Sequence, residues 1–367
     1  MHGLYSAFPG VANIADDRQL WRVRSGMIAR IRAPLRLPHG IALMHGFSML
    51  WRSALFFLGL VGAAFAQERV IFLLPAPQFL PAFAPHNVAL VKGYYRQEGA
   101  EVEFRTLRGG AEVAARLSRG EGDLGGATAD TAIQARAQGA LVRNVALLGG
   151  RSLTQLVFRK DKNIYQPAEL RGKRITVMSF TDTSYYALLG FLNSVGLSKQ
   201  DVSIQEAGPV GVFQNVIDDK ADGMAGVPDW IPPFRDKGID ISVMQVGRFF
   251  PNMAQTIIAA DRHIKERPDA IRAFVRATLH GLKDVMEDPA AATALIVKAY
   301  PKQHLGHEED LRETLEYYVR YVYPGQRTLG EMSELRLSQL QDFYVREGII
   351  ERAAPVKDLY TNEFVLR

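Results

Sequence analysis

Short apolar runs alternate with amphipathic stretches along the chain from residue 70 onward. Residues 70–74, with the sequence VIFLL, predict a first strand, which Pro75 ends. A helix is predicted over residues 85–97, because a proline opens this stretch and Gly99 is suited to a C-terminal cap. Strands that alternate with helices in this way are typical of an α/β fold with parallel sheets.

The same alternation continues to about residue 246. Further strands are predicted at residues 101–104, 156–158, 174–178, 202–204, 223–225 and 241–246. Helices are predicted at residues 111–118 and 184–195. After Asp261 the pattern becomes helical, with apolar residues spaced three and four apart from Ile271 to Leu282, and helices are predicted at residues 311–322 and 333–347.

Residues 120–125 match the glycine pattern G-x-G-x-x-G. In dinucleotide-binding proteins this pattern follows a strand and opens a helix. Here the order is reversed, since a predicted helix precedes the glycines and a short apolar segment follows them. The pattern therefore indicates a turn and not a nucleotide site.

A leader for export is predicted near the N-terminus. Arg52 precedes an apolar run over residues 54–61, and the small residues up to Ala66 are followed by the polar Gln67. A basic flank, a short apolar region and an A-x-A site in this order are typical of a secretory signal peptide. We expect a signal peptide over residues 44–66 with cleavage between Ala66 and Gln67. Residues 1–43 are interpreted as a misassigned start or a disordered tail.

The leader changes the interpretation of charge. Of the 44 basic residues 7 lie before Gln67, and of the 39 acidic residues 2 do, so 37 of each kind remain. The basic character of the whole sequence gives no support for nucleic-acid binding. The chain has no cysteine, so it lacks the acceptor for a bacterial lipid anchor. A soluble periplasmic protein without a lipid anchor is predicted.

Five segments together resemble a known family: residues 89–102, 117–125, 167–175, 195–202 and 267–275. The chain is similar to the periplasmic substrate-binding proteins for sulfonate, nitrate and thiamine-pyrimidine uptake. This resemblance implies an α/β, two-lobed periplasmic-binding-protein type II fold with two crossover segments and C-terminal helices. By chain order, lobe 1 is expected at residues 67–155 plus 257–367, and lobe 2 at residues 156–256.

The resemblance implies a monomeric, non-enzymatic component of an ABC importer that needs no cofactor. Its expected partners are a small-molecule ligand and the membrane permease with its cytoplasmic ATPase. One alternative is an enzyme like the fungal thiamine-pyrimidine synthases of this family, but their cysteine-rich motif has no counterpart in a chain without cysteine. Another is a ligand sensor outside transport, or a surface protein without a small ligand.

Ligand contacts are expected where strands end, because loops and helix N-termini there present unpaired polar groups. In lobe 1 the candidates are Gln78, Phe79, Thr128 and Asp130. In lobe 2 and near the return crossover they are Phe180, Thr181, Thr183, Tyr185, Asp229, Trp230 and Asn252. The alternatives are helix capping for the hydroxyl and carboxylate groups, and core or interlobe packing for Phe79 and Trp230.

The candidate set is aromatic and rich in hydroxyls, without a pair of arginines to clamp an anion. This favours a flat heterocycle such as a pyrimidine over nitrate, taurine or another sulfonate. Arg108, Arg143 or Arg151 would reverse the preference by reaching the cleft. His304 and His307 have a spacing that suits a metal on a helix face, but a loop or helix start is the preferred interpretation and no metal site is expected.

Overall fold

The computed structural model describes residues 67–365. The predictions for residues 1–43 and for the signal peptide at residues 44–66 lie outside the described residues. All described residues belong to one compact unit that begins at Gln67. Among them, no helix is both long and apolar enough to cross a lipid bilayer.

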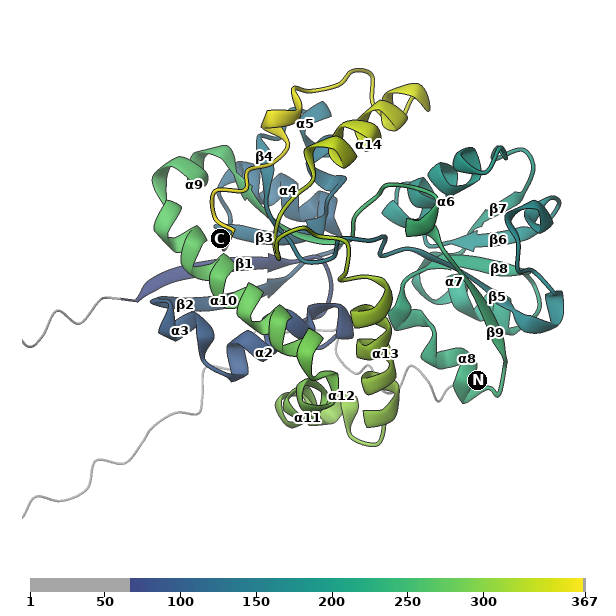
Figure 1. Cartoon of the computed structure of the whole chain (residues 1–367), viewed down its shortest axis with the longest axis horizontal. Helices are drawn as coiled ribbons and strands as arrows, with labels where there is room; N and C mark the ends of the chain where they lie inside the picture. The colour runs from purple at the N-terminus through teal and green to yellow at the C-terminus, as the bar shows by residue number, and fades with distance from the viewer. Residues whose placement is uncertain (1–66, 366–367) are drawn as a thin grey trace, which may run out of the picture. The chain divides into compact units, whose positions relative to one another are not determined.

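The first sheet has the strand order β2-β1-β3-β10-β4. Its strands are β1 (Glu68–Leu74), β2 (Ala100–Thr106), β3 (Leu124–Thr128), β4 (Val142–Leu147) and β10 (Gln255–Ala260). Strand β1 runs parallel to β2 and β3, whereas β10 runs antiparallel to β3 and β4. The chain therefore leaves this sheet after β4 and returns to its interior with β10 (Figure 1).

The second sheet has the order β7-β6-β8-β5-β9. Its strands are β5 (Gln155–Arg159), β6 (Arg174–Val177), β7 (Ser203–Glu206), β8 (Gly223–Gly226) and β9 (Ile241–Gln245). Strand β6 is parallel to β7 and β8, but β5 is antiparallel to β8 and β9. The prediction of parallel sheets is confirmed for the pairs of β1 and of β6, and it was wrong for the pairs of β5 and β10. Parallel neighbours need a crossover over the same sheet, whereas β5 and β10 enter directly from the other sheet.

Two crossover segments join the sheets: residues 148–154 between β4 and β5, and residues 246–254 between β9 and β10. These two segments are called the first and the second crossover below. The predicted lobe boundaries at residues 155 and 256 fall at their ends, and they stay a prediction.

The helices surround the two sheets. They are α2 (Ala84–Val91), α3 (Tyr94–Gln97), α4 (Gly110–Arg119), α5 (Thr131–Ala137), α6 (Thr183–Ser194), α7 (Gly208–Ile217), α8 (Pro232–Asp236), α9 (Asp261–Glu266), α10 (Pro268–Glu287), α11 (Pro289–Ala299), α12 (Pro301–His304), α13 (Glu308–Tyr321) and α14 (Glu334–Arg346). Helix α4 precedes residues 120–125 and β3 begins at Leu124 within them, which confirms the turn and not the dinucleotide order.

The prediction of one helix over residues 85–97 was wrong, because this stretch forms two helices. Helix α2 ends at Val91, and Gly93 takes a left-handed φ of 74° before α3 begins at Tyr94. A residue without a Cβ adopts this conformation at little cost, so the glycine interrupts the helix here.

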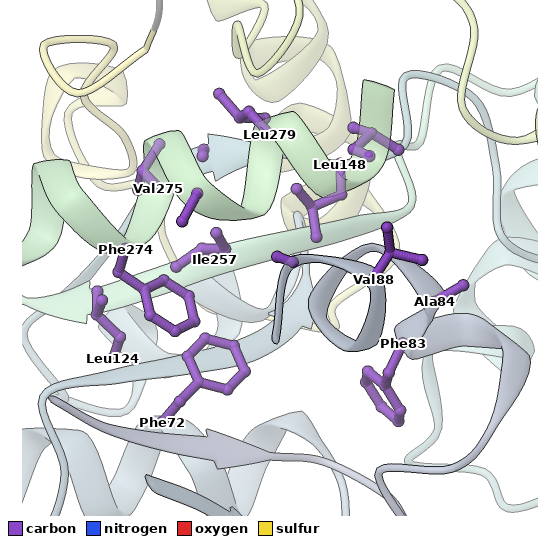
Figure 2. Packing of buried hydrophobic residues seen from close by; sticks show 14 of the residues in the cluster. Phe72, Phe83, Ala84, Val88, Leu124, Leu148, Ile257, Phe274, Val275 and Leu279 are labelled. Atoms are coloured by element: carbon purple, nitrogen blue, oxygen red, sulfur yellow. The ribbon is translucent and has the colours of Figure 1, made fainter. Parts of the chain in front are cut away.

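The first core lies between the first sheet and helices α2 and α10. Figure 2 shows Phe72 of β1 facing Phe274 of α10, and the two rings stack at 4.6 Å between centroids. Helices α2 and α10 approach closely at Gly281, where a Cβ would lie 2.1 Å from the carbonyl oxygen of Pro85. The second apolar cluster contains Leu147 of β4, Leu156 of β5 and residues of α14, so α14 covers the region where the two sheets meet.

Candidate functional site

A small polar cavity lies where the two sheets and both crossovers come together. It is lined by Thr128, Asp130, Leu153, Thr154, Thr183, Ala187, Phe250, Asn252, Met253 and Tyr344. Its volume is about 10 Å³, and about one water molecule fits in a space of that size. Four of the predicted contact residues thus meet at this cavity: Thr128, Asp130, Thr183 and Asn252.

Asp130 supplies a carboxylate to the cavity. It stands at the N-terminus of α5, but its own backbone is already helical and its side chain makes no capping hydrogen bond. The carboxylate instead accepts hydrogen bonds from the Tyr344 hydroxyl at 2.7 Å and from Gln134 Nε2 at 3.1 Å. Burial raises the pKa of Asp130. The capping alternative therefore does not apply to this residue, whose carboxylate faces the junction of the sheets.

Of the residues predicted around the start of α6, only Thr183, which opens the helix, lines the cavity. Asp182 caps this helix by accepting a hydrogen bond from the Ser184 amide at 2.9 Å. The hydroxyl of Thr181 is exposed and pairs with Ser179 at 2.8 Å. Phe180 is 45% exposed, and its ring lies edge-on to Tyr185 at 5.2 Å. Thr181, Phe180 and Tyr185 do not line the cavity.

Gln78 and Phe79, which follow β1, are engaged with helices around the first sheet. Gln78 Nε2 donates to Asn87 Oδ1 at 3.2 Å, and Asn87 Nδ2 donates back to the Gln78 carbonyl at 2.8 Å. His304 Nε2 lies 2.9 Å from the Phe79 carbonyl oxygen, and burial lowers the pKa of His304. Within residues 67–365, no group of three or more His, Cys, Asp or Glu side chains is placed to hold a metal ion.

Asp229 connects the end of β8 to elements that surround the first sheet. Its Oδ1 accepts a hydrogen bond from the Ala82 amide at 3.2 Å, and its Oδ2 accepts one from the Tyr318 hydroxyl of α13. Burial raises the pKa of Asp229. Trp230 packs against the apolar cluster around Val157 on the second sheet. Asp229 therefore bridges the two halves of the molecule.

Sequence reasoning missed several buried polar groups beside the crossovers. Gln155 Oε1, both amide atoms of Gln255 and the Tyr323 hydroxyl make no hydrogen bond within residues 67–365. These side chains are 1%, 9% and 1% exposed, respectively. Gln155 opens β5 and Gln255 opens β10, each directly after a crossover. A glutamine that opens a mostly apolar strand is the sequence feature that would have revealed Gln155 and Gln255.

The arginines considered for an anion clamp are used elsewhere. Arg143 Nε donates to Asp261 at 2.8 Å, and Arg151 Nη1 donates to the Arg320 carbonyl at 3.3 Å. Arg108 is exposed.

A different arginine, Arg336 of α14, holds the two crossovers. Its Nη1 donates to the carbonyl of Gly150, its Nε to that of Pro251 at 3.1 Å and its Nη2 to that of Asn252 at 2.7 Å. One guanidinium thus ties the first crossover to the second, and α14 fixes their relative position.

The chain is similar in sequence to a known protein family and to several characterised proteins. The family model described as "NMT1/THI5 like" matches residues 80–292. The riboflavin-binding protein RibY of Chloroflexus aurantiacus is 29% identical over 311 residues, which cover 82% of this chain and 88% of that protein. The 4-amino-5-hydroxymethyl-2-methylpyrimidine phosphate synthase of Schizosaccharomyces pombe is 25% identical over 259 residues, with coverage of 66% and 72%.

Among solved structures, the periplasmic aliphatic sulphonate binding protein SsuA from Escherichia coli superposes with a TM-score of 0.63 and 16% identity. The superposition covers 82% of this chain and 93% of that one. The likeness confirms the predicted fold class, an α/β fold of the periplasmic-binding-protein type.

Proposed function

Because the chain belongs to the NMT1/THI5-like family and has the fold of periplasmic binding proteins, we propose that it is the solute-binding component of an ABC importer. It binds one small molecule between lobe 1 (residues 67–155 plus 257–367) and lobe 2 (residues 156–256), without changing it chemically. It acts in the periplasm as a monomer and delivers the solute to the membrane permease, which the cytoplasmic ATPase drives.

One observation carries this proposal: polar side chains from both lobes converge at the junction of the two sheets. Thr128 and Asp130 come from lobe 1, Thr183 and Asn252 from lobe 2, and all four line the same cavity. A binding protein that closes on its ligand needs contacts from both halves, because the ligand then stabilises the closed form selectively.

The cavity volume of about 10 Å³ describes a closed arrangement. A ligand larger than water enters only when the lobes separate. Separation breaks the hydrogen bonds of Asp229 with Ala82 and Tyr318, and the ion pairs of Arg235 with Asp310 and Glu313 on α13. These contacts are the energetic link between ligand binding and lobe closure.

We favour a flat heterocycle as the ligand. One relative is named for riboflavin and another for a thiamine pyrimidine, and both molecules contain a nitrogen heterocycle. Arg143 and Arg151, which would clamp a sulfonate or nitrate, are bonded to Asp261 and to the Arg320 carbonyl. Riboflavin and pyrimidines are therefore the first solutes to test.

An enzyme related to the pyrimidine synthases is the second candidate, and the 25% identity to the fission yeast enzyme favours it. The chain has no cysteine, so a mechanism that depends on the cysteine-rich motif of the fungal enzymes has no counterpart here. The two functions differ in what happens to the ligand, because a binding protein releases it unchanged.

Thermal-shift screening of the chain from Gln67 onward tests the proposal. The panel contains riboflavin, uracil, a thiamine pyrimidine, taurine and nitrate. A ligand at a hundred times its Kd adds about 2.7 kcal/mol to the free energy of unfolding. For a chain of this size that raises the melting temperature by roughly 5 °C. No shift with any member of the panel would count against the solute-binding function.

A further inference from the structure

Several buried hydrogen-bonding atoms beside the crossovers lack a partner of good geometry in the described chain. They include Oε1 of Gln155, Oδ1 of Asn252, the carboxamide of Gln255 and the hydroxyl of Tyr323. Buried polar groups in folded proteins are almost always hydrogen-bonded, because an unpaired one loses its hydration without compensation. These atoms are therefore available to a group outside the polypeptide.

Gln255 and Tyr323 belong to one polar cluster at the junction of the sheets. Gln255 is the register partner of the cavity residue Thr128. Burial and the nearby charge of Asp229 raise the pKa of Tyr318, while the Gln255 amide acts in the opposite direction, which places Gln255 beside the Tyr318 hydroxyl. The charge of Asp229 also contributes to the raised pKa of Tyr323, whose ring lies 5.4 Å from that of Tyr318.

Gln155 holds the corresponding position on the second sheet. It is the register partner of Gly226 on β8. Gly226 lies against the Trp230 ring, because a Cβ on it would be 2.7 Å from Trp230 Cε3. The Nε2 of Gln155 donates to the Ser152 carbonyl at 3.1 Å, which fixes the carboxamide and leaves Oε1 as an acceptor. Each crossover is thus followed by a glutamine with a free acceptor.

The charge around these groups disfavours an anion. Asp229 is the carboxylate beside Tyr318 and Tyr323, and a second negative charge in this buried cluster would be repelled. The guanidinium of Arg336 is bonded to three crossover carbonyls. A ligand group that fits here is uncharged and offers both a donor and an acceptor.

We propose that Gln255, assisted by Gln155 and Tyr323, is the specificity-determining residue for an uncharged ligand with a lactam or imide edge. A carboxamide presents one N–H donor and one C=O acceptor side by side, and a ring –CO–NH– group is its complement. This inference rests on the proposed function and refines it, since it assigns the substrate class and separates this protein from sulfonate and nitrate binders.

Gln255→Met removes both hydrogen-bonding atoms with little change in side-chain length. Gln138→Met, at an exposed position, is the matched control. Affinities for riboflavin, its N3-methyl derivative, uracil and taurine are measured by calorimetric titration. Gln255→Met is expected to bind riboflavin or uracil at least tenfold more weakly, whereas Gln138→Met binds like the wild type. Methylation of N3 is expected to weaken binding to the wild type but not further to Gln255→Met, because both changes remove the same interaction.

The melting temperature of Gln255→Met without ligand serves as the folding control. It is expected at or above that of the wild type, because the variant no longer buries unpaired polar atoms. Equal riboflavin and uracil affinities in wild type and variant would mean that the buried amide pairs only with ordered water, and would overturn the inference alone. Tight binding of taurine and none of the lactams would also overturn it, while leaving the solute-binding function in place. Binding of none of the probes would overturn both the inference and the solute-binding function.

Discussion

A buried histidine makes the stability of this protein depend on pH in a calculable way. His86 on α2 is 2% exposed, and neither ring nitrogen has a hydrogen-bond partner within residues 67–365. Its ring lies 4.9 Å from that of Phe72 and 6.2 Å from that of Phe83. Burial lowers its pKa to about 3 from the ordinary value of 6.5. The imidazole is therefore neutral in the folded protein throughout the usual pH range.

The sign of the effect follows from proton uptake. Below pH 6.5 the unfolded chain binds a proton at His86 and the folded chain does not, so the free energy of unfolding falls as the pH decreases towards 3. The loss approaches about 1.4 kcal/mol per pH unit. Between about pH 7.5 and pH 5 it amounts to about 2 kcal/mol.

Substitution of His86 by Phe tests this value. The free energy of unfolding of wild type and His86→Phe is measured by urea titration at both pH values. The substitution changes the packing equally at both pH values. The difference in the free energy of unfolding between the two proteins should therefore shift by about 2 kcal/mol in favour of His86→Phe at the lower pH. A difference that stays constant with pH would show that His86 is hydrated or protonated in the folded state.

Three further predictions concern the two crossovers, the first core and lobe closure. Arg336→Ala removes the hydrogen bonds that join the two crossovers, and should lower the free energy of unfolding by about 2 to 3 kcal/mol in urea titrations. Gly281→Ala places a methyl group 2.1 Å from the Pro85 carbonyl oxygen, so calorimetry should show a loss of at least about 2 kcal/mol. Arg235→Ala removes exposed ion pairs to α13 and should weaken ligand binding about twofold at low salt and less at high salt, as seen by titration.

Local pattern was sufficient to predict most elements of this fold. The strand at residues 70–74 and the helix at residues 184–195 correspond to β1 and α6 within two residues at each end. The direction of the strands within each sheet was not predictable. Strands β5 and β10 enter their sheets from the crossovers and run antiparallel to their neighbours, and their sequences do not indicate this direction. One helix was predicted over residues 85–97, yet Gly93 takes a left-handed conformation between α2 and α3.

The residues of the candidate site that directly follow strands could be predicted from the sequence. Those that reach the site from distant segments of the chain could not. Thr128 and Asp130 follow from the position of β3 in the chain. Tyr344 reaches the same cavity from α14, far along the sequence, so only folding brings its hydroxyl to Asp130. Gln255 was missed because a polar residue at the start of a strand usually faces solvent, whereas this one is 9% exposed.

Equilibrium dialysis followed by analysis of the bound solute tests the central claim most directly. The chain from Gln67 onward is dialysed against riboflavin, uracil, a thiamine pyrimidine, taurine and nitrate, and the retained molecules are recovered by denaturation and identified. The proposed function predicts that one molecule of a flat heterocycle is retained per chain and is recovered unchanged. Retention of no solute, or recovery of a chemically altered one, would contradict it.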